Sequence, residues 1–404
     1  MNTDPINRTP ATTTLHQEGT DSTVITPDEA TTSLTAAITR SVARNRQAQD
    51  AMIATSILVE LRSAGVDGLG VAALANRLGQ RKPTVDRLLS VFSDAGQIER
   101  GPRGRSWLSV KKDGTVPLAM TPDGHEIPVA LFDAGVEHAL IVGGANTGKS
   151  NTLATQLLPG VIAGLDVVFY IDGGHGMSAT HLAGACDWWA VDGPQEWSQV
   201  IEAAHAVMRA RAARRTAPRV PAWRGRMETD PILTVAIDES AAVKSMLPQH
   251  VQDLVLDILR EGRKVGVRVI QVAHDATGED LIGGRRGREL VTGNGVVIGH
   301  RAGEVTANLL AESGDDSIDL RRLPMEPGWC GIIRRGHVLT WAARVKRAAP
   351  DKISAALALT PVRALTGEDL AAAGPAYTSR VKGRTDWHLM WARLREVPAG
   401  FGPV

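Results

Sequence analysis

Residues 138–164 read HALIVGGANTGKSNTLATQLLPGVIAG, and this stretch decides the fold. Its apolar start predicts a buried strand and its second half predicts a helix. Between them, residues 143–150 fit the pattern GxxxxGK[ST]. The backbone N–H groups of such a glycine-rich loop, together with the start of the following helix, attract phosphate groups. The stretch therefore predicts a phosphate-binding loop inside an α/β domain.

The loop also assigns roles to its own residues. We expect Lys149 to reach the β and γ phosphates of ATP and Ser150 to ligate Mg²⁺. The alternative is a chance glycine-rich turn, and the flanking strand and helix count against it. The residues expected to bind the nucleotide are Gly143, Gly144, Ala145, Asn146, Thr147, Gly148, Lys149, Ser150 and Asn151.

A second apolar run, ILTVAIDES at residues 232–240, ends in two neighbouring acids. A nucleotide site that hydrolyses ATP needs one carboxylate for the metal ion and a base for the attacking water. We expect Asp238 to bind the metal and Glu239 to activate the water. The alternative is an ordinary acidic strand end. Because a glutamate stands here, the sequence favours an active ATPase over a passive nucleotide-binding switch.

The neighbouring segments have the same strand and helix alternation. DVVFYID at 166–172, VRVIQVAH at 267–274 and GVVIGH at 295–300 are short runs rich in valine and isoleucine, separated by segments of helical character. Strands buried on both faces of a parallel sheet have this composition. We therefore predict an α/β domain of the doubly wound type.

The segment before this domain has a different pattern. Helical spacing begins at about Gln47, and further short helices are predicted at 71–79 and 83–96. QIERGPRGRSWLSV at 97–110 then reads as a two-stranded hairpin. Helix, helix, helix and hairpin predict a winged helix-turn-helix. The expected organisation is a disordered tail at 1–46, the winged helix at 47–112, a linking hairpin at 113–134, the P-loop ATPase domain at 135–348 and a C-terminal extension at 349–404.

Basic clusters suggest where nucleic acid binds. The early residues of the second helix of a helix-turn-helix enter the major groove, and a basic wing suits the phosphate backbone or a minor groove. Winged helices also bind proteins, but two adjoining basic clusters favour DNA. The segment 283–289 carries further arginines on a loop expected to face DNA. The predicted DNA contacts are Arg81, Lys82, Thr84, Arg87, Arg103, Arg105, Arg285 and Arg286.

Composition sets limits on these functions. The 404 residues carry 45 basic and 44 acidic side chains, so affinity for DNA must come from local clusters. Two cysteines, Cys186 and Cys330, cannot form a four-ligand zinc site or a disulfide framework. There is no apolar run of about 18 residues and no secretion signal. We expect a cytoplasmic protein.

From about Val116 to Trp341, the chain resembles the motor domain of the FtsK/SpoIIIE family of double-stranded DNA translocases. The likeness lies in PLAMTPDGHEIPVALFDAGVEHALIVGGANTGKS, TVAIDES and REGRKVGVRVIQVAH. It implies a RecA-like ATPase that uses ATP and Mg²⁺, forms a ring, usually a hexamer, and moves along duplex DNA. Two positions depart from the family pattern. His274 replaces the usual glutamine, so it either senses the γ phosphate or is a satisfied core or hydrogen-bonding histidine. Asp172-Gly173-Gly174-His175 replaces Asp-Pro-Lys.

The resemblance also implies a site completed between subunits and a cellular role. An arginine from the next subunit completes each site in such rings, and the candidates are Arg263 and Arg301, with solvated arginines as the alternative. Members without a membrane anchor resemble TraB-type proteins that move plasmid DNA during conjugation, recruited by a membrane-protein partner at the septum or cell envelope. Chromosome segregation fits equally. A different class is an ATP-switched winged-helix regulator that does not translocate.

Overall fold

The computed structural model describes residues 27–64, 67–101, 105–110, 115–130, 136–176, 179–216, 231–311 and 319–383. The chain divides into two units, residues 1–48 and 49–404. None of the helices within the described ranges is both long enough and apolar enough to span a membrane.

Helix α1 (Pro27–Ala64) begins where we expected disordered chain up to residue 46. The physical reason is local. Pro27 suits the first position of a helix, Asp28 and Glu29 follow in the first turn, and no glycine or further proline interrupts the sequence as far as Ala64. Residues 41–49 are exposed, and burial begins at Ile53. Residues 1–26 of the expected tail lie outside the described residues.

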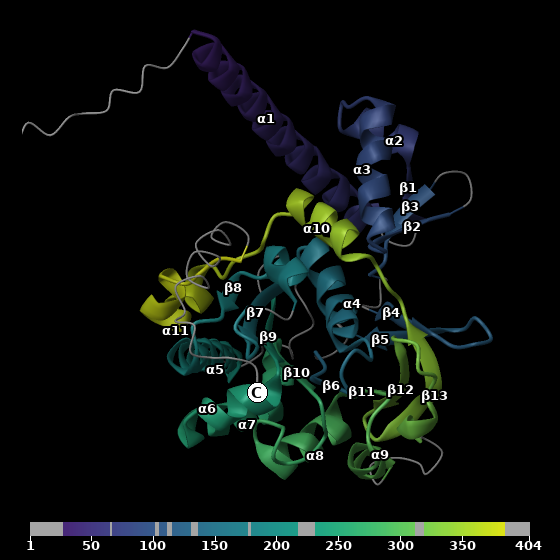
Figure 1. Cartoon of the computed structure of the whole chain (residues 1–404), viewed down its shortest axis with the longest axis vertical. Coiled ribbons are helices and arrows are strands. Elements are labelled where there is room, and N and C mark those ends of the chain that lie inside the picture. Colours follow the sequence, from purple (N-terminus) through teal and green to yellow (C-terminus); the bar gives the residue numbers. More distant parts are fainter. Residues whose placement is uncertain are drawn as a thin grey trace, which may run out of the picture. The chain divides into compact units, whose positions relative to one another are not determined.

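The segment from the end of α1 to residue 110 builds a small helical part with its own sheet (Figure 1). Its apolar core contains Leu74, Val85, Leu88 and Phe92, all with no exposed surface. The three strands of this segment, as far as it is described, pair antiparallel in the order β1-β3-β2. The elements are α2 (Val71–Arg77), α3 (Lys82–Asp94), β1 (Leu69–Gly70), β2 (Ile98–Arg100) and β3 (Arg105–Leu108).

The rest of the described chain is built around a mixed sheet of ten strands, in the order β5-β4-β13-β12-β11-β6-β10-β9-β7-β8. The strands from β11 to β8 are parallel, and the strands from β5 to β12 join them antiparallel. This is an α/β fold, as the sequence predicted. The strands are β4 (Thr115–Met120), β5 (Glu126–Ala130), β6 (Ala139–Val142), β7 (Asp166–Asp172), β8 (Trp188–Ala190), β9 (Ile232–Asp238), β10 (Val267–Ala273), β11 (Val296–His300), β12 (Trp329–Arg334) and β13 (His337–Val345).

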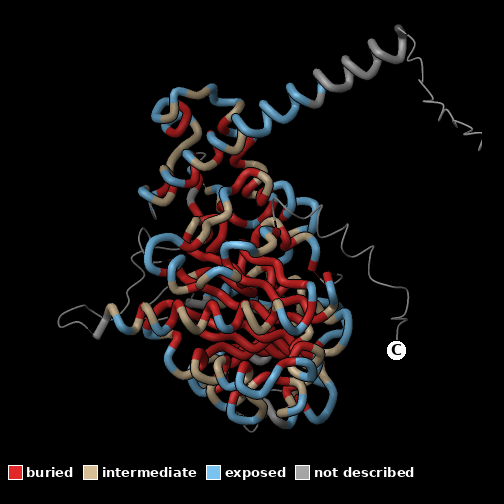
Figure 2. Tube along the Cα trace, turned by 90° about the vertical axis from the view of Figure 1, so that its left-hand side faces the viewer, coloured by how far each residue is buried: buried red, intermediate tan, exposed pale blue. Residues whose placement is uncertain are grey.

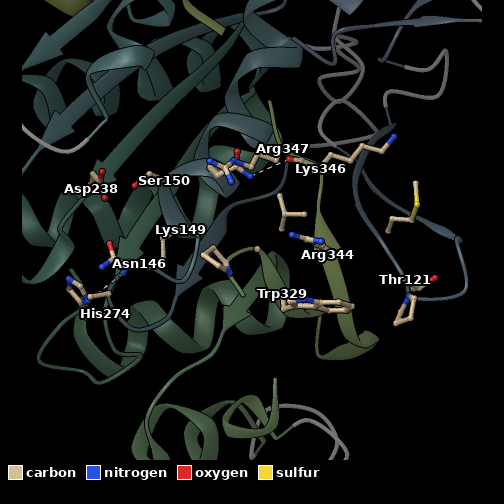
Figure 3. Close-up of a pocket in the computed structure, with 18 of the residues that line it drawn as sticks. Thr121, Asn146, Lys149, Ser150, Asp238, His274, Trp329, Arg344, Lys346 and Arg347 are labelled. Atoms are coloured by element: carbon tan, nitrogen blue, oxygen red, sulfur yellow. Dashed lines mark hydrogen bonds between the residues drawn. The ribbon is translucent and has the colours of Figure 1, made fainter. Parts of the chain in front are cut away.

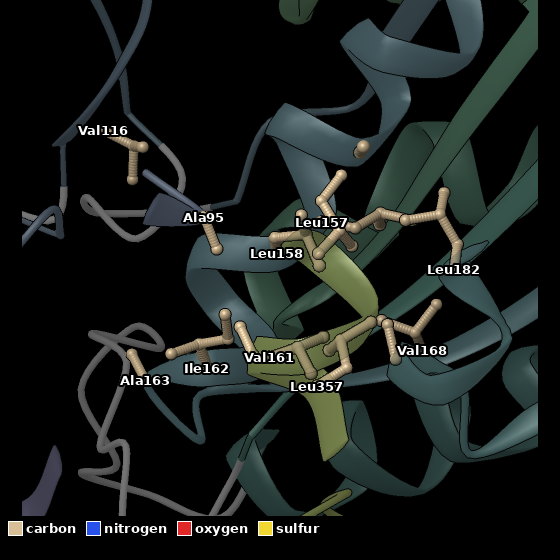
Figure 4. Close-up of a cluster of buried hydrophobic side chains, with 14 of the residues drawn as sticks. Ala95, Val116, Leu157, Leu158, Val161, Ile162, Ala163, Val168, Leu182 and Leu357 are labelled. Atoms are coloured by element: carbon tan, nitrogen blue, oxygen red, sulfur yellow. The ribbon is translucent and has the colours of Figure 1, made fainter. Parts of the chain in front are cut away.

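Helices cover both faces of this sheet. Alternate residues of the strands belong to two separate apolar clusters, as the two-residue period of a strand requires. The first cluster contains residues of α4, η3 and α10, and Figure 4 shows part of it around Leu157, Val161 and Leu357. The second contains residues of α5, α6, α7, α8 and α11. Figure 2 shows the buried residues gathered along the strands between these layers.

These layers contain helices of very different length. Several are short connections at the strand ends, and five of those in the described part of the chain have three turns or more. The helices are α4 (Lys149–Ile162), η3 (Thr180–Ala185), α5 (Pro194–Thr216), α6 (Ser240–Met246), α7 (Gln249–Glu261), η4 (Gly262–Val265), α8 (Gly284–Asn294), α9 (Glu304–Ala311), η5 (Leu320–Arg322), α10 (Pro350–Leu359) and α11 (Gly367–Thr378).

The hairpin β4–β5, predicted as a linker, is the outer edge of the main sheet, because β4 pairs with β13 through Met120 and Arg344. The C-terminal helices pack on the same body. Helix α11 lies against α5, where the buried guanidinium of Arg211 binds the Asp369 carboxylate at 2.6 Å. Of the two C-terminal helices, the sequence predicted only the one at 350–359, and the one at 367–378 was missed.

The topology fixes where functional side chains can meet. Strands β6, β7, β9, β10 and β11 run parallel, so the segments that follow them emerge at one edge of the sheet. That edge carries the phosphate loop after β6, the two acids at the end of β9 and His274 after β10.

Candidate nucleotide-binding site

The phosphate loop connects β6 to α4, and its backbone requires glycine at two positions. Gly143 has a φ of 155° and Gly148 a φ of 109°. A Cβ on Gly143 would lie 2.6 Å from the Cβ of His300, and one on Gly148 would lie 2.8 Å from the backbone N of Gly328. Both the conformation and the close packing therefore exclude larger residues.

Two backbone hydrogen bonds attach the loop to neighbouring segments. The N–H of Gly144 donates to the carbonyl of Arg301 at 2.9 Å, and the N–H of Gly328 donates to the carbonyl of Thr147 at 2.8 Å. The loop is therefore fixed to the end of β11 and to the residue before β12. This anchoring holds the start of α4, with its positive dipole end, at the pocket.

Lys149 is the first residue of α4, and its ammonium lies across the loop. Nζ donates to the carbonyls of Gly143 and Gly144, at 2.9 Å each. Burial lowers the pKa of Lys149, and the carboxylates of Glu239 and Asp238 act in the opposite direction. The half-buried ammonium is thus a positive charge held where an anionic phosphate would meet the loop.

Asp238 ends β9 and is 3% exposed. Its Oδ2 accepts a hydrogen bond from the Tyr170 hydroxyl at 2.8 Å, and its Oδ1 accepts one from the N–H of Glu239 at 3.0 Å. Burial, together with the charges of Asp172 and Glu239, raises the pKa of Asp238 to about 6. Ser150 lines the same pocket. The Ser150 hydroxyl and the Asp238 carboxylate, which its hydrogen bonds orient, are oxygen ligands of the kind that Mg²⁺ prefers.

Glu239 is the N-cap residue of α6 and has a left-handed conformation, with a φ of 52°. A residue with a Cβ holds this conformation only when its surroundings enforce it. Here Gly173 packs underneath: its N–H donates to the Asp238 carbonyl at 3.1 Å, and a Cβ on it would lie 2.9 Å from the Glu239 carbonyl. Strained backbone at a strand end is typical of functional sites, and it presents the Glu239 side chain to the pocket.

His274 lies between the lysine and the glutamate. Its Nδ1 is 3.4 Å from Nζ of Lys149, and its Nε2 is 3.3 Å from Oε2 of Glu239. In this arrangement Nδ1 can accept from the Lys149 ammonium while Nε2 donates to the Glu239 carboxylate. The imidazole is 47% exposed in the pocket, so His274 is not a core histidine. Its role as a γ-phosphate sensor stays a prediction.

The two candidate arginines occupy opposite edges of the sheet. Arg301 follows β11 beside the phosphate loop, and its guanidinium donates to the Leu323 carbonyl at 2.7 Å. Arg263 lies in η4 ahead of β10, where Nε donates to the Val136 carbonyl at 3.2 Å. Neither side chain lines the pocket of its own chain. Action on a neighbouring subunit stays a prediction for both.

The predicted DNA contacts of the expected helix-turn-helix are only partly available at the surface. Arg81 and Lys82 are exposed at the start of α3, and Thr84 is partly exposed. Arg87 pairs with Asp50 of α1 at 2.6 Å, and Arg105 donates to the Asp67 carbonyl at 2.8 Å. Arg103 lies outside the described residues.

The segment 283–289, expected to be a loop, instead begins helix α8 at Gly284, and the predicted contacts of the main body lie on this helix. Arg285 pairs with Glu289 one turn later at 2.8 Å, with both side chains exposed. Arg286 is exposed beside it. Their role in binding DNA stays a prediction.

The pocket has a volume of about 960 Å³, and residues beyond those predicted from the sequence also line it. Figure 3 shows Lys149, Ser150, Asp238 and His274 along one side of it. Sequence reasoning missed the other side, although GWCGIIRRGHVLTWAARV at 328–345 carries a hairpin signal around Arg335-Gly336. The missed lining residues are Met120, Thr121, Pro122, Pro327, Gly328, Trp329, Arg344, Val345, Lys346 and Arg347.

Comparisons with known proteins give structural likeness only. No protein-family model matches the chain, and no curated protein matches its sequence. Among solved structures, EssC (ATPases 2 and 3) from Geobacillus thermodenitrificans is 17% identical over 75% of this chain and 52% of that chain, with a TM-score of 0.47. The pCW3 conjugation coupling protein TcpA, with ATPγS, is 15% identical over 67% and 85%, with a TM-score of 0.47.

A third solved structure is the cytoplasmic domain of the Thermomonospora curvata type VII secretion ATPase EccC, which is 17% identical with a TM-score of 0.43. The match covers 63% of this chain and 30% of that one. The chain thus spans about half or less of the secretion ATPases that it matches. All three TM-scores are below 0.5.

Proposed function

We propose that this chain is an ATPase that binds ATP with Mg²⁺ in the pocket of the phosphate loop. One observation carries the proposal: Lys149, Asp238 and Glu239, from two different strand ends, line a single pocket at the carboxyl edge of the sheet. A lysine on a glycine loop, a buried carboxylate and a second carboxylate are the groups that phosphoryl transfer to water requires.

Each residue has a chemical task in this proposal. Loop N–H groups and the Lys149 ammonium bind the β and γ phosphates, and Ser150 and Asp238 would hold Mg²⁺, which neutralises charge developing on the phosphates. Glu239 accepts a proton from the water that attacks the γ phosphorus. The Nε2–H of His274 orients the Glu239 carboxylate, at the 3.3 Å separation seen here.

We further propose that hydrolysis drives movement along double-stranded DNA in a homo-hexameric ring of RecA-like subunits of the FtsK/SpoIIIE type. The order of helices and antiparallel strands in residues 49–110 supports a winged helix-turn-helix, and exposed Arg81 and Lys82 at the start of α3 support DNA binding there. The proposed task is transfer of plasmid or mobile-element DNA between cells or compartments, by a cytoplasmic ring recruited to the envelope by a membrane-protein partner.

ATP hydrolysis measured with and without duplex DNA tests this proposal. We expect DNA to stimulate turnover in the parent protein, and Lys149→Ala to abolish turnover and weaken nucleotide binding, because the charge on the β and γ phosphates is lost. Glu239→Gln keeps the shape of the side chain but cannot take a proton, so it should bind ATP and stall. DNA-stimulated turnover retained in Lys149→Ala would refute the site.

Movement needs its own assay. A triplex-forming oligonucleotide bound to a linear duplex should be displaced by the parent protein with ATP and not by Glu239→Gln. A parent protein that hydrolyses ATP without displacing the oligonucleotide would exclude translocation. The second candidate is an ATP-switched winged-helix regulator, and it is favoured by the departures from the FtsK/SpoIIIE pattern at His274 and at residues 172–175. This regulator would show nucleotide-dependent DNA binding without turnover.

A further inference from the structure

We propose that the side of the pocket missed by sequence reasoning binds the base and ribose of the nucleotide, with the indole of Trp329 as the surface on which the base stacks. This inference rests on the proposed nucleotide site and adds the recognition of the nucleoside. We call this side the nucleoside half, formed by residues 120–122, 327–329 and 344–347.

The nucleoside half is directly continuous with the phosphate loop. Trp329 follows Gly328, whose N–H donates to the Thr147 carbonyl at 2.8 Å. The backbone of Gly328 passes so close to Gly148 that a Cβ there would lie 2.8 Å from the Gly328 nitrogen. An aromatic ring is therefore fixed one residue away from the point where the loop is anchored.

A second set of hydrogen bonds fixes Trp329 to the helix that follows the loop. The Trp329 carbonyl accepts from Nδ1 of His300 at 2.9 Å, and Nε2 of the same buried imidazole lies 2.8 Å from the hydroxyl of Thr152 in α4. The backbone that carries the indole is thus tied to the loop and to α4. A nucleotide whose phosphates lie on the loop meets a pre-positioned ring.

The indole has open surface on the pocket side. Trp329 is only partly buried, and Figure 3 shows its ring between Lys149 on one side and Thr121 of the β4–β5 turn on the other. Arg344 pairs with Trp329 across β12 and β13 and is exposed in the same pocket. A nucleobase can stack on a partly exposed aromatic ring, and this ring lies in the same pocket as the residues proposed to bind the phosphates.

Two polar side chains of the nucleoside half, Thr121 and Lys346, are occupied by partners in the protein, whereas the guanidiniums of Arg344 and Arg347 are exposed. The Thr121 hydroxyl bonds within its own turn, to Asp123 and His125. The Asn151 amide donates to the Lys346 carbonyl at 3.2 Å, and the Lys346 ammonium pairs with Glu126 at 2.5 Å. Because stacking uses the face of a base and not its edge, we infer a site for purine nucleoside triphosphates that discriminates little between ATP and GTP.

Binding measurements on the full chain test this inference, with ATP, GTP and inorganic tripolyphosphate as ligands in a Mg²⁺ buffer. Trp329→Ala should weaken the binding of ATP and GTP on the order of tenfold and leave the binding of tripolyphosphate unchanged, since only the nucleosides stack on the ring. Trp329→Phe keeps an aromatic face and should retain most of the affinity. Met325→Ala is the control, because it removes an exposed apolar side chain nearby that does not line the pocket.

Failure of this inference is distinct from failure of the nucleotide site. If Lys149→Ala leaves all three ligands bound as before, the phosphate loop is not the site. If Trp329→Ala lowers the affinity for ATP and for tripolyphosphate equally, the ring only supports Gly328, and the proposed role of the nucleoside half is refuted. Unchanged ATP affinity in Trp329→Ala refutes it as well. Parent fluorescence should be quenched by ATP, not by tripolyphosphate, and this difference should be lost in Trp329→Phe even if the alanine variant does not fold.

Discussion

Oε2 of Glu239 lies 3.3 Å from Nε2 of His274, at the ends of the neighbouring parallel strands β9 and β10. The left-handed backbone at Glu239 and its packing on Gly173 fix one partner, and the contact of His274 with Lys149 fixes the other. The proposed base and the proposed phosphate ligand are therefore linked through one imidazole.

We predict that His274→Ala lowers kcat for ATP hydrolysis by about tenfold or more, with a smaller effect on KM, because the imidazole positions Glu239 without carrying the substrate. His274→Gln has an amide that can accept from Lys149 and donate to Glu239, so it should retain most of the rate. Steady-state kinetics of the three proteins decide the matter. Equal kcat in the parent and His274→Ala would remove the positioning role.

Subunit mixing tests the proposed action of Arg263 and Arg301 between neighbours. Lys149→Ala subunits have an inactive pocket but keep both arginines, whereas Arg301→Ala or Arg263→Ala subunits keep the pocket. If an arginine acts on the next subunit, mixing its variant with Lys149→Ala should restore part of the ATPase activity. The hydrogen bond from Gly144 to the backbone of Arg301 survives the substitution. Full activity of each arginine variant alone, independent of protein concentration, would exclude the ring site.

The start of α3 should determine affinity for duplex DNA. Replacing Arg81 and Lys82 together with alanine removes two exposed positive charges, so binding should weaken on the order of tenfold and the salt slope should fall by about two. Arg77→Ala is the matched control, because Arg77 already pairs with Glu60 at 2.8 Å. Fluorescence anisotropy at several salt concentrations measures both effects. Equal losses in the control and the double variant would argue against recognition by α3.

His300 should make stability depend on pH. Burial lowers the pKa of His300 to about 4, from an ordinary value of 6.5 in the unfolded chain. The unfolded state therefore binds the extra proton between these values. The contribution of uncharged His300 to the free energy of unfolding is fully present above about pH 6.5. It falls as the pH falls towards 4, by roughly 3 kcal/mol in total. Urea unfolding of the parent and His300→Gln at pH 7.5, 6 and 5 should show a shallower decline in the variant. Parallel pH profiles would refute this assignment.

The contact between α11 and α5 should contribute strongly to stability. Asp369→Ala leaves the Arg211 guanidinium, 1% exposed, without its carboxylate, and we expect a loss of about 3–5 kcal/mol in the free energy of unfolding. Glu368→Ala is the matched control. Its carboxylate is 71% exposed and pairs with Arg214 at the surface, so its loss should cost less than about 1 kcal/mol. Similar unfolding midpoints for both variants would contradict this difference.

The sequence predicted the five central strands and the phosphate loop because their signals are local. Runs of valine and isoleucine, a glycine loop before a helix and two acids after a strand each depend on residues close together in the chain. Lys149 and Glu239 line one pocket because parallel strands end at the same edge of a sheet. The part of α1 before residue 47 was missed because the apolar periodicity that indicates a helix begins only at about Gln47.

The nucleoside half could not be predicted in the same way. A hairpin around Gly336 is readable from the sequence, but its place beside β11 depends on strand order, which no local pattern encodes. Trp329 therefore gave no sign of belonging to the phosphate site. The pairing of Arg87 with Asp50 was equally hidden, since it depends on how α3 packs on α1.

The strand order also bears on how the chain acquires its structure during synthesis. Strand β6, which leads into the phosphate loop, pairs on both sides with strands that come much later, β10 and β11. The loop then takes a hydrogen bond from Gly328, which is later still. The ribosome thus synthesises the phosphate loop, with Lys149, long before it synthesises the strands and the glycine that fix the loop in place. Because its central strands pair with segments far away in the sequence, we expect this protein to fold slowly.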